Sequence, residues 1–271
     1  MTIASAAASV GKAPGAGAGI RRFVRRNPTM AAGGLILALV AAVALAAPLF
    51  AGDPITMQPA QRLLAPSPAH WLGTDHLGRD VFARTLYGAR ISLLVGLSVA
   101  TLSIAFGLVI GLLAGYFRPV EAVVMRMMDG LMAIPAILLA IALVALTRAS
   151  VSVVIAAITI PEIPRVVRLV RAVVLSVREA PYVEAAVAGG SRAHKILIRH
   201  ILPNTIAPLI VQATYITASA ILTESALSFL GAGVPPEVPT WGTMIASGQQ
   251  YADDAFWVVG FPGLAIEGNS V

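Results

Sequence analysis

Few side chains in this sequence have the types and spacing that catalysis or metal binding requires. The chain has no cysteine, which excludes disulfides, thiolate metal sites and cysteine nucleophiles. His70, Asp75 and His76 have the right types for metal ligands, but a solvated loop explains them better. No Gly-x-x-x-x-Gly-Lys-Ser/Thr phosphate loop is present, so the chain does not itself hydrolyse ATP. We expect no catalytic residue, no metal and no cofactor bound by this chain.

One carboxylate has an unusual position. Glu224 follows an uncharged run of 23 residues, Ile201–Thr223. A charge at the centre of a bilayer costs at least ~2.5 kcal/mol, so such residues usually face protein or water. Glu224 therefore either lines or gates a solute path, or lies near the outer end of its helix and bonds to neighbours such as Ser225 or, at an interface, to another subunit. We favour the second, structural interpretation.

The composition indicates that lipid is the solvent for much of the chain. Of its 271 residues, 58% are hydrophobic and only 12% are charged, whereas soluble domains carry about 25% charged residues. The net charge of +6 is compatible with nucleic acid, but in membrane proteins basic residues mark the cytoplasmic side. We predict an all-α integral membrane protein with no nucleic-acid partner.

The uncharged runs predict about six transmembrane helices, because a bilayer core of ~30 Å needs ~20 apolar residues. The apolar pattern of the fourth run continues to Val174. The last run has only 12 residues, ~18 Å as helix, so we expect an incomplete last span. The runs are Met30–Phe50, Ile91–Phe117, Gly130–Thr147, Ala149–Pro161, Ile201–Thr223 and Ala255–Ile266.

Charge distribution orients these spans. With a cytoplasmic N-terminus, 14 of the 19 Lys and Arg residues lie inside, as the positive-inside rule requires. The chain then divides into a disordered cytoplasmic tail with a basic cluster (1–27), a first span with an extracytoplasmic segment (28–90), and a membrane core (91–271). Within the second part, Asp80–Arg90 is either an amphipathic surface helix or an ordered loop.

Two charge pairs are predicted at helical spacing. Arg126 with Asp129, and Glu162 with Arg165, are each three residues apart, which places both members on one helix face. We interpret both pairs as structural.

The stretch 178–204 is the most informative. Pro181 suits the first position of a helix, and Gly189-Gly190 predicts its end, because glycine readily adopts positive φ. Ser191 would cap a second short helix, and Pro203 would open the next span. We predict a helix–turn–helix on the cytoplasmic face, although composition alone is compatible with an ordinary basic loop.

The spacing within this stretch resembles the EAA loop of ABC importer permeases. In that family the loop forms a coupling helix that docks into a groove on a cytoplasmic ATPase subunit. His200 departs from the pattern, which usually has an apolar residue there. The residues that carry the resemblance, and to which it assigns ATPase coupling, are Glu184, Ala185, Ala186, Gly190, Leu202 and Pro203.

Two further stretches resemble the dipeptide, oligopeptide and nickel permeases, and in particular the second permease of each pair. They are 70–93, which contains His-Trp-Leu-Gly-Thr-Asp-His-Leu-Gly-Arg-Asp, and 222–242, which contains Glu-Ser-Ala-Leu-Ser-Phe-Leu-Gly. The resemblance implies a type I ABC importer transmembrane domain in the bacterial inner membrane, with EAA coupling loop 178–204. In this family the last helix usually continues into a cytoplasmic segment, and this chain departs from that pattern.

The implied function is the translocation path of an ATP-driven, binding-protein-dependent importer of di- and oligopeptides. The implied partners are a second homologous permease, two ATPase subunits carrying ATP and Mg²⁺, and an extracytoplasmic solute-binding protein. Nickel or glutathione are alternative cargoes for the same machinery. A secondary transporter driven by an ion gradient is an alternative of another class, while a membrane enzyme or scaffold lacks any supporting constellation.

Overall fold

The computed structural model describes residue 38 and residues 41–270, and its regular elements there are helices. The all-α prediction is confirmed for these residues, while the tail 1–27 and the start of the span Met30–Phe50 lie outside them. A helix at Ala41–Phe50 comes first. The others are η1 (Pro59–Gln61), α3 (Val81–Tyr116), α4 (Arg118–Met132), α5 (Ala136–Ala145), α6 (Val151–Arg178), α7 (Pro181–Ala188), α8 (Ala193–Ile196), η2 (Leu197–Ile201), α9 (Leu202–Phe229), α10 (Trp241–Gly248), η3 (Gln249–Tyr251) and α11 (Trp257–Ser270).

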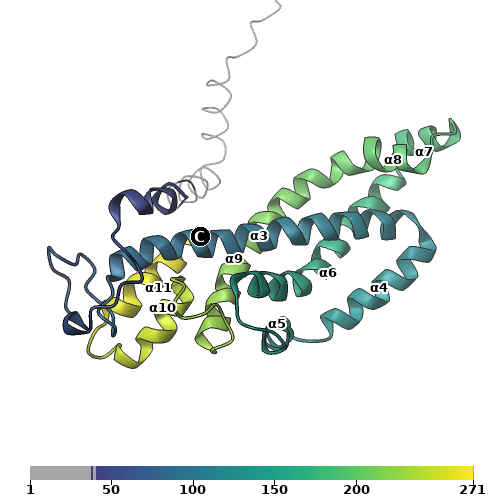
Figure 1. Ribbon diagram of the computed structural model, residues 1–271. Helices are drawn as coiled ribbons and strands as arrows, with labels where there is room; N and C mark the ends of the chain where they lie inside the picture. Colours follow the sequence, from purple (N-terminus) through teal and green to yellow (C-terminus); the bar gives the residue numbers. More distant parts are fainter. Residues whose placement is uncertain (1–37, 39–40, 271) are drawn as a thin grey trace, which may run out of the picture.

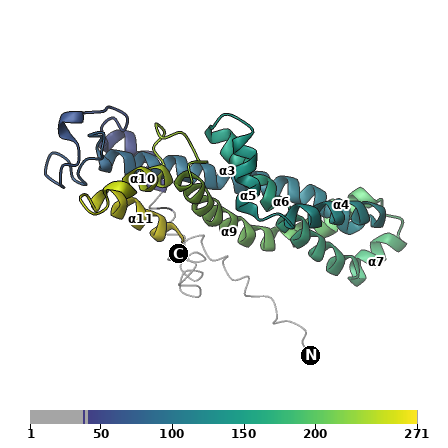
Figure 2. The ribbon, with the colours of Figure 1, turned by 90° about the horizontal axis from the view of Figure 1, so that it is seen from below.

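Helix α3 runs the length of the molecule, with α6 and α9 packed along it (Figures 1 and 2). Its start lies beside the segment 51–80 and helices α10 and α11, whereas α7 and α8 lie near its other end. The core between the three long helices is built from small and branched side chains, such as Val95, Val99, Ala157 and Ile216, all of them buried. This arrangement separates two candidate functional regions by the length of α3.

Helix α3 is longer than the sequence indicated. Asp80 caps it, its carboxylate accepting a hydrogen bond from the Ala83 N–H at 2.9 Å. No proline or cap interrupts the helix at the boundary where Arg90 is followed by Ile91. The segment Asp80–Arg90, predicted as a surface helix or a loop, therefore forms one helix with the predicted span. Its 36 residues extend over ~54 Å, well beyond a ~30 Å bilayer core.

A glycine stripe lets α3 and α6 approach closely. A Cβ atom at any of three glycines of α3 would lie 2.5 to 2.7 Å from the Cβ of a valine on α6, closer than carbon atoms can pack. The glycines and the valines both recur every fourth residue, so each set occupies one helix face. In order along the interface, Gly107, Gly111 and Gly115 face Val166, Val170 and Val174.

The predicted continuous span Gly130–Thr147 is wrong. The chain forms α4 and α5 instead, bent by 84° at the break between them. Pro135 explains the break, because proline lacks the N–H that continues a helix and restricts the residue before it. The fourth predicted span does continue past its first 13 residues, since α6 runs to Arg178 with Pro161 and Pro164 inside it.

Length and composition identify fewer spans than predicted among the described residues. The continuous helix Ala193–Phe229 and α3 are long and apolar enough to cross a membrane, and the bent pair α4–α5 can count as a third span. The helices at Ala41–Phe50 and Trp257–Glu267 are apolar but shorter. The count of about six therefore remains a prediction.

Candidate functional site

The loop 178–204 contains the sharp turn that its glycines predict. Pro181 lies in the first turn of α7, which ends at Ala188 with Gly189 as its C-cap. Gly190 has a φ of +76°. The N–H of Gly190 bonds to the Val187 carbonyl at 2.9 Å, and that of Ser191 to the Ala186 carbonyl at 3.0 Å. These two bonds form a Schellman motif, so the prediction of a glycine turn is confirmed.

The second half of the predicted helix–turn–helix differs from expectation. Arg192, not Ser191, precedes α8, and no side chain caps that helix. No separate short helix forms, because α8, η2 and α9 join into one helix, Ala193–Phe229. Pro203 lies in the first turn of α9 without interrupting it. The segment η2 before it has π-helical bonding, in which the Leu202 N–H reaches the Leu197 carbonyl.

Helix α7 presents most of its surface to solvent. Val183 is fully buried and anchors the helix to the core. Glu184 and Ala185 are exposed, as is Gly190 at the turn, and Ala186 is half-buried. Small side chains flanked by exposed Tyr182 and Val187 form a shallow face that a second protein can approach closely.

Leu202 and Pro203 do not share that face. They lie at the base of α9, where Leu202 is half-buried. A hydrogen bond joins α7 to the base of α9, because the Asn204 amide donates to the Tyr182 hydroxyl at 3.3 Å. The same amide also donates to the nearby His200 carbonyl at 2.7 Å. Tyr182 and Asn204 could not be selected from the sequence, because their pairing depends on how α7 folds back on α9.

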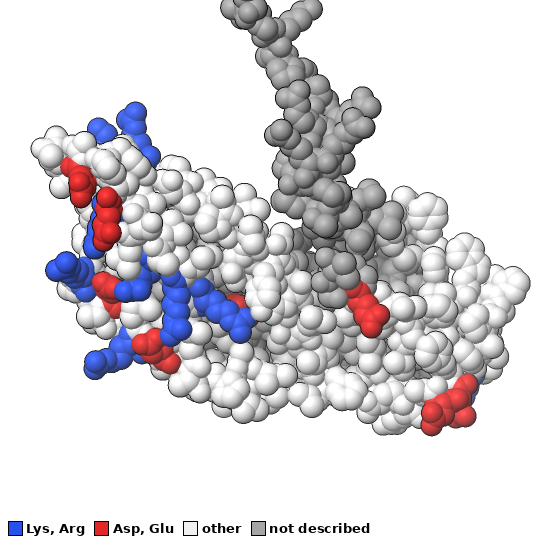
Figure 3. Space-filling view, turned by 180° about the vertical axis from the view of Figure 1, so that it is seen from behind, with Lys and Arg blue, Asp and Glu red and all other residues white. Residues whose placement is uncertain are grey.

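On the face that Figure 3 shows, Lys and Arg gather towards the same end of the molecule as this loop, with several acidic residues among them. The predicted pair Glu162–Arg165 is confirmed at 2.8 Å. The predicted pair Arg126–Asp129 is wrong, because Asp129 binds Arg168 of α6 at 2.5 Å. Arg171 of α6 likewise pairs with Glu121 of α4. Ion pairs therefore join α4 to α6 across the helix interface.

Comparison with known proteins assigns this chain to a family. Residues 107–266 match the binding-protein-dependent transport system inner membrane component. The chain is 55% identical over 245 residues to a probable peptide ABC transporter permease protein of Sinorhizobium fredii, covering 90% of this chain and 84% of that protein. This chain belongs to the binding-protein-dependent transport permeases.

Other relatives and one solved structure agree with this assignment. The dipeptide transport system permease protein DppC of Alkalihalophilus pseudofirmus is 42% identical, with 90% of this chain and 81% of that protein covered. The glutathione transport system permease protein GsiD of Pectobacterium atrosepticum is 40% identical, with 91% and 82% covered. A chain of the inward-facing MetNI methionine ABC transporter matches the fold, with a TM-score of 0.53 at 19% identity over 68% of this chain and 88% of that one.

At the other end of the permease, Glu224 is fully buried within the chain. One of its carboxylate oxygens accepts hydrogen bonds from the Ser228 hydroxyl at 2.8 Å and the Thr240 hydroxyl at 2.9 Å. Thr240 also caps α10. The predicted partner Ser225 is wrong, because the next residue along a helix points to a different side. Glu224 thus connects α9 to α10; its part in a path or interface remains a prediction.

Helix α10 is also joined to α3. The indole N–H of Trp241 donates to the Thr85 carbonyl at 3.0 Å, and its ring lies against Gly88, where a Cβ would come within 3.1 Å. On the other side, a Cβ on Gly242 would lie 2.6 Å from the Ser225 Cα. The first turn of α10 is therefore wedged between α3 and α9.

The segment 51–80 is organised around a buried carboxylate. Asp75 accepts hydrogen bonds from the N–H groups of Leu77 and Arg79, and pairs with the Arg79 side chain at 2.6 Å. The Arg84 guanidinium lies 3.8 Å from the same carboxylate and donates to the Pro54 carbonyl at 3.2 Å. All three charged side chains are almost fully buried. Two cations therefore share one anion.

The three side chains considered as metal ligands have separate partners. His70 contacts the Asp80 carboxylate at 2.9 Å and the Gln61 side chain at 3.0 Å. His76 stacks on Tyr251 with ring centroids 5.3 Å apart, and burial lowers the pKa of His76. Asp75 is engaged by Arg79. Each of these bonds secures the fold of the segment.

Proposed function

We propose that this permease forms, with a second homologous permease, the translocation path of an ATP-driven importer of di- and oligopeptides. The observation that carries the proposal is the exposed face of α7, fixed by the Schellman turn at Gly190, at the position where the sequence resembles a coupling helix. The peptide cargo is supported by relatives named as peptide and dipeptide permeases.

The proposed assembly has the N-terminus and the loop 178–204 in the cytoplasm. Two ATPase subunits carrying ATP and Mg²⁺ dock there, while a solute-binding protein delivers cargo to the segment 51–80 on the other side. The chain crosses the bacterial inner membrane about six times. The gathering of Lys and Arg towards the α7 end supports this orientation, since basic residues favour the cytoplasmic side.

In this mechanism Glu184, Ala185 and Ala186 bear against the ATPase groove, and Gly190 keeps the turn narrow enough to enter it. Closure of the ATPase dimer displaces α7. The displacement passes to the continuous helix Ala193–Phe229, in which Leu202 and Pro203 directly follow the π-helical segment η2. At the far end, the hydrogen bond that the Thr240 hydroxyl donates to Glu224 passes the displacement to α10, and the spans alternate between inward and outward access.

Uptake by the reconstituted assembly tests this function. The permease is purified with the subunits that accompany it, placed in liposomes, and given the accompanying binding protein and a labelled dipeptide. We expect accumulation that requires ATP and persists when a protonophore collapses the proton gradient. Accumulation that survives ATP depletion but stops with the protonophore would instead establish an ion-driven secondary transporter.

Glutathione is a second candidate cargo, because a relative of 40% identity is named as a glutathione permease. The same liposomes distinguish the two cargoes. Excess unlabelled glutathione abolishes uptake of the labelled dipeptide only if the binding protein accepts both, whereas a peptide-specific system is inhibited by unlabelled dipeptide alone.

A further inference from the structure

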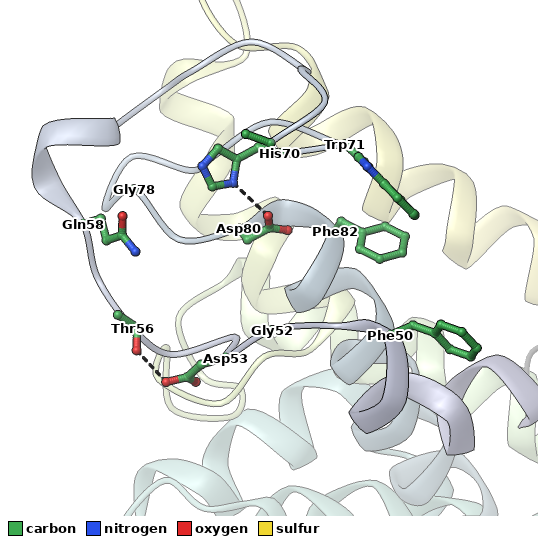
Figure 4. Close-up of a pocket in the computed structure, with 11 residues that line it drawn as sticks. Phe50, Gly52, Asp53, Thr56, Gln58, His70, Trp71, Gly78, Asp80 and Phe82 are labelled. Atoms are coloured by element: carbon green, nitrogen blue, oxygen red, sulfur yellow. Dashed lines mark hydrogen bonds and ion pairs between the residues drawn. The ribbon is translucent and has the colours of Figure 1, made fainter.

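A cavity of about 480 Å³ opens in the segment 51–80 and the flanking helix ends. Aromatic rings of Phe50, Trp71 and Phe82 lie on one side, and polar side chains on the other (Figure 4). Trp71 and Phe50 are 66% and 75% exposed, although aromatic rings of this size are usually buried. All eleven lining residues come from residues 50–82, so the cavity belongs to this segment and not to a path between α3, α6 and α9.

The cavity has an excess of negative charge. Asp53 and Asp80 both line it, and none of the eleven described lining residues is Lys or Arg. Hydrogen bonds from the Thr56 hydroxyl and the Ile55 N–H lower the pKa of Asp53, so its carboxylate is ionised. Of the cations near it, Arg79 and the α3 residue Arg84 are buried and pair with Asp75, and exposed Arg62 is not among the lining residues.

Carboxylates beside exposed aromatic faces form a site for an organic cation. A guanidinium or ammonium group gains charge-assisted hydrogen bonds from the carboxylates and cation–π attraction from the rings. Aliphatic stems of Lys and Arg also pack well on apolar surface. A cavity of this volume accommodates one such side chain together with water.

We propose that this cavity receives a lysine or arginine side chain of the solute-binding protein when that protein docks. The inference rests on the proposed function and adds the chemistry of one contact to it. A phospholipid headgroup fits less well, because a zwitterionic lipid places a phosphate beside its amine. No lining Lys or Arg is present to neutralise that phosphate, and His70 is engaged by Asp80 and Gln61.

The test is a titration of the full assembly in nanodiscs with its purified binding protein, followed by stimulated ATP hydrolysis. We expect the variant Asp53→Asn/Asp80→Asn to require about tenfold more binding protein for half-maximal stimulation, because charged rim contacts govern association. Asparagine retains the helix cap that Asp80 provides. Salt weakens screened ion pairs, so raising it should affect the wild type more than this variant.

Two matched variants complete the design. The variant Asp53→Glu keeps both carboxylates of the cavity, so its half-maximal stimulation should require nearly the same concentration of binding protein as the wild type. Asp253→Asn removes an exposed carboxylate outside the cavity and should titrate as the wild type does. Equal half-saturation in the wild type and the double variant would overturn the cavity proposal.

The remaining outcomes are also decisive. A wild-type assembly that no concentration of binding protein stimulates would refute the proposed importer function itself, which is a different failure. An unchanged titration, combined with loss of co-purifying phosphatidylethanolamine from the double variant, would make the cavity a lipid site and overturn docking of a basic side chain.

Discussion

The loop 178–204 and the segment 51–80 lie at opposite ends of α3 and are held in different ways. Within the loop, helix α7 has one buried residue, Val183, and ends in a turn closed by backbone hydrogen bonds. The segment is held by three almost fully buried charged side chains, its own Asp75 and Arg79 and Arg84 of α3, which bond to one another and to the backbone. Its fold therefore depends on side-chain chemistry, whereas that of the loop depends on backbone conformation.

This difference accords with the proposed roles. A face that docks on a moving partner needs an exposed surface and a defined turn, and it gains little from internal cross-links. A segment that projects beyond the membrane has few apolar residues to bury, so a network of polar bonds must define its shape. The two ends should consequently fail in different ways when altered: the loop by loss of coupling, the segment by loss of folding.

The largest effect is expected from removing the buried carboxylate. Asp75→Ala leaves the guanidiniums of Arg79 and Arg84 buried without their anion, and breaking such a pair costs about 3–5 kcal/mol. Thermal unfolding of the detergent-purified protein should shift to a markedly lower temperature. The exposed carboxylate variant Asp253→Ala serves as the control and should unfold near the wild type. Equal melting of Asp75→Ala and the control would show that the network does not secure the segment.

A smaller effect on stability, but a large one on function, is expected at Gly190. Its φ of +76° is unfavourable by about 1–2 kcal/mol for residues with a Cβ, most of all for branched ones. Gly190→Val should uncouple ATP hydrolysis from uptake while changing the melting temperature little. The ratio of labelled peptide transported to ATP hydrolysed measures this coupling.

The matched variant is Gly190→Asn, because asparagine tolerates the left-handed region. No atom lies within 4 Å of a Cβ at this position, so the two variants differ in backbone preference and not in steric clash. Retained coupling in Gly190→Asn and lost coupling in Gly190→Val would support the turn as the critical feature. Normal uptake per ATP in the valine variant would rule out a coupling role.

At the contact between α9 and α10, a loss of stability smaller than that of Asp75→Ala is expected. Thr240→Val removes one hydrogen bond to the buried Glu224 and also the cap of α10, and taking a hydrogen-bond partner from a buried polar group costs about 1–3 kcal/mol. Thr240→Ser retains the hydroxyl and should restore both. Protease sensitivity of the stretch 231–257 measures the release of α10. If both variants are cleaved as slowly as the wild type, Glu224 does not hold α10 in place.

The sequence predicted best what depends on local chemistry. The turn at Gly190 followed from the glycines alone, and the continuity of α6 from its apolar pattern. Contacts between distant segments escaped prediction. The partner of Asp129 lies on α6, and that of Glu224 lies 16 residues away across a loop. The network around Asp75 was not predicted either, because charged residues in a loop are ordinarily expected to face water.

The length of helices was the other source of error. Uncharged runs marked where lipid can surround the chain, but a helix extends until a cap or proline ends it. Helix α3 therefore begins at Val81, ten residues before its uncharged run, and the run at Gly130–Thr147 is divided at Pro135. Hydropathy locates spans, and backbone chemistry sets their ends.

The smallest expected effect is a pH dependence confined to the segment 51–80. Burial lowers the pKa of His76 in the folded protein, so the unfolded chain binds the proton more readily. The folded state should lose stability as the pH falls below about 6.5, the ordinary pKa of histidine, and the full contribution should be present above that value.

His76→Phe keeps a ring to stack on Tyr251 but cannot be protonated. Melting temperatures between about pH 5 and 8 should then fall more steeply on the acid side for the wild type than for this variant. Parallel curves would mean that His76 stays hydrated enough to titrate normally, and that the polar network alone defines this end of the molecule.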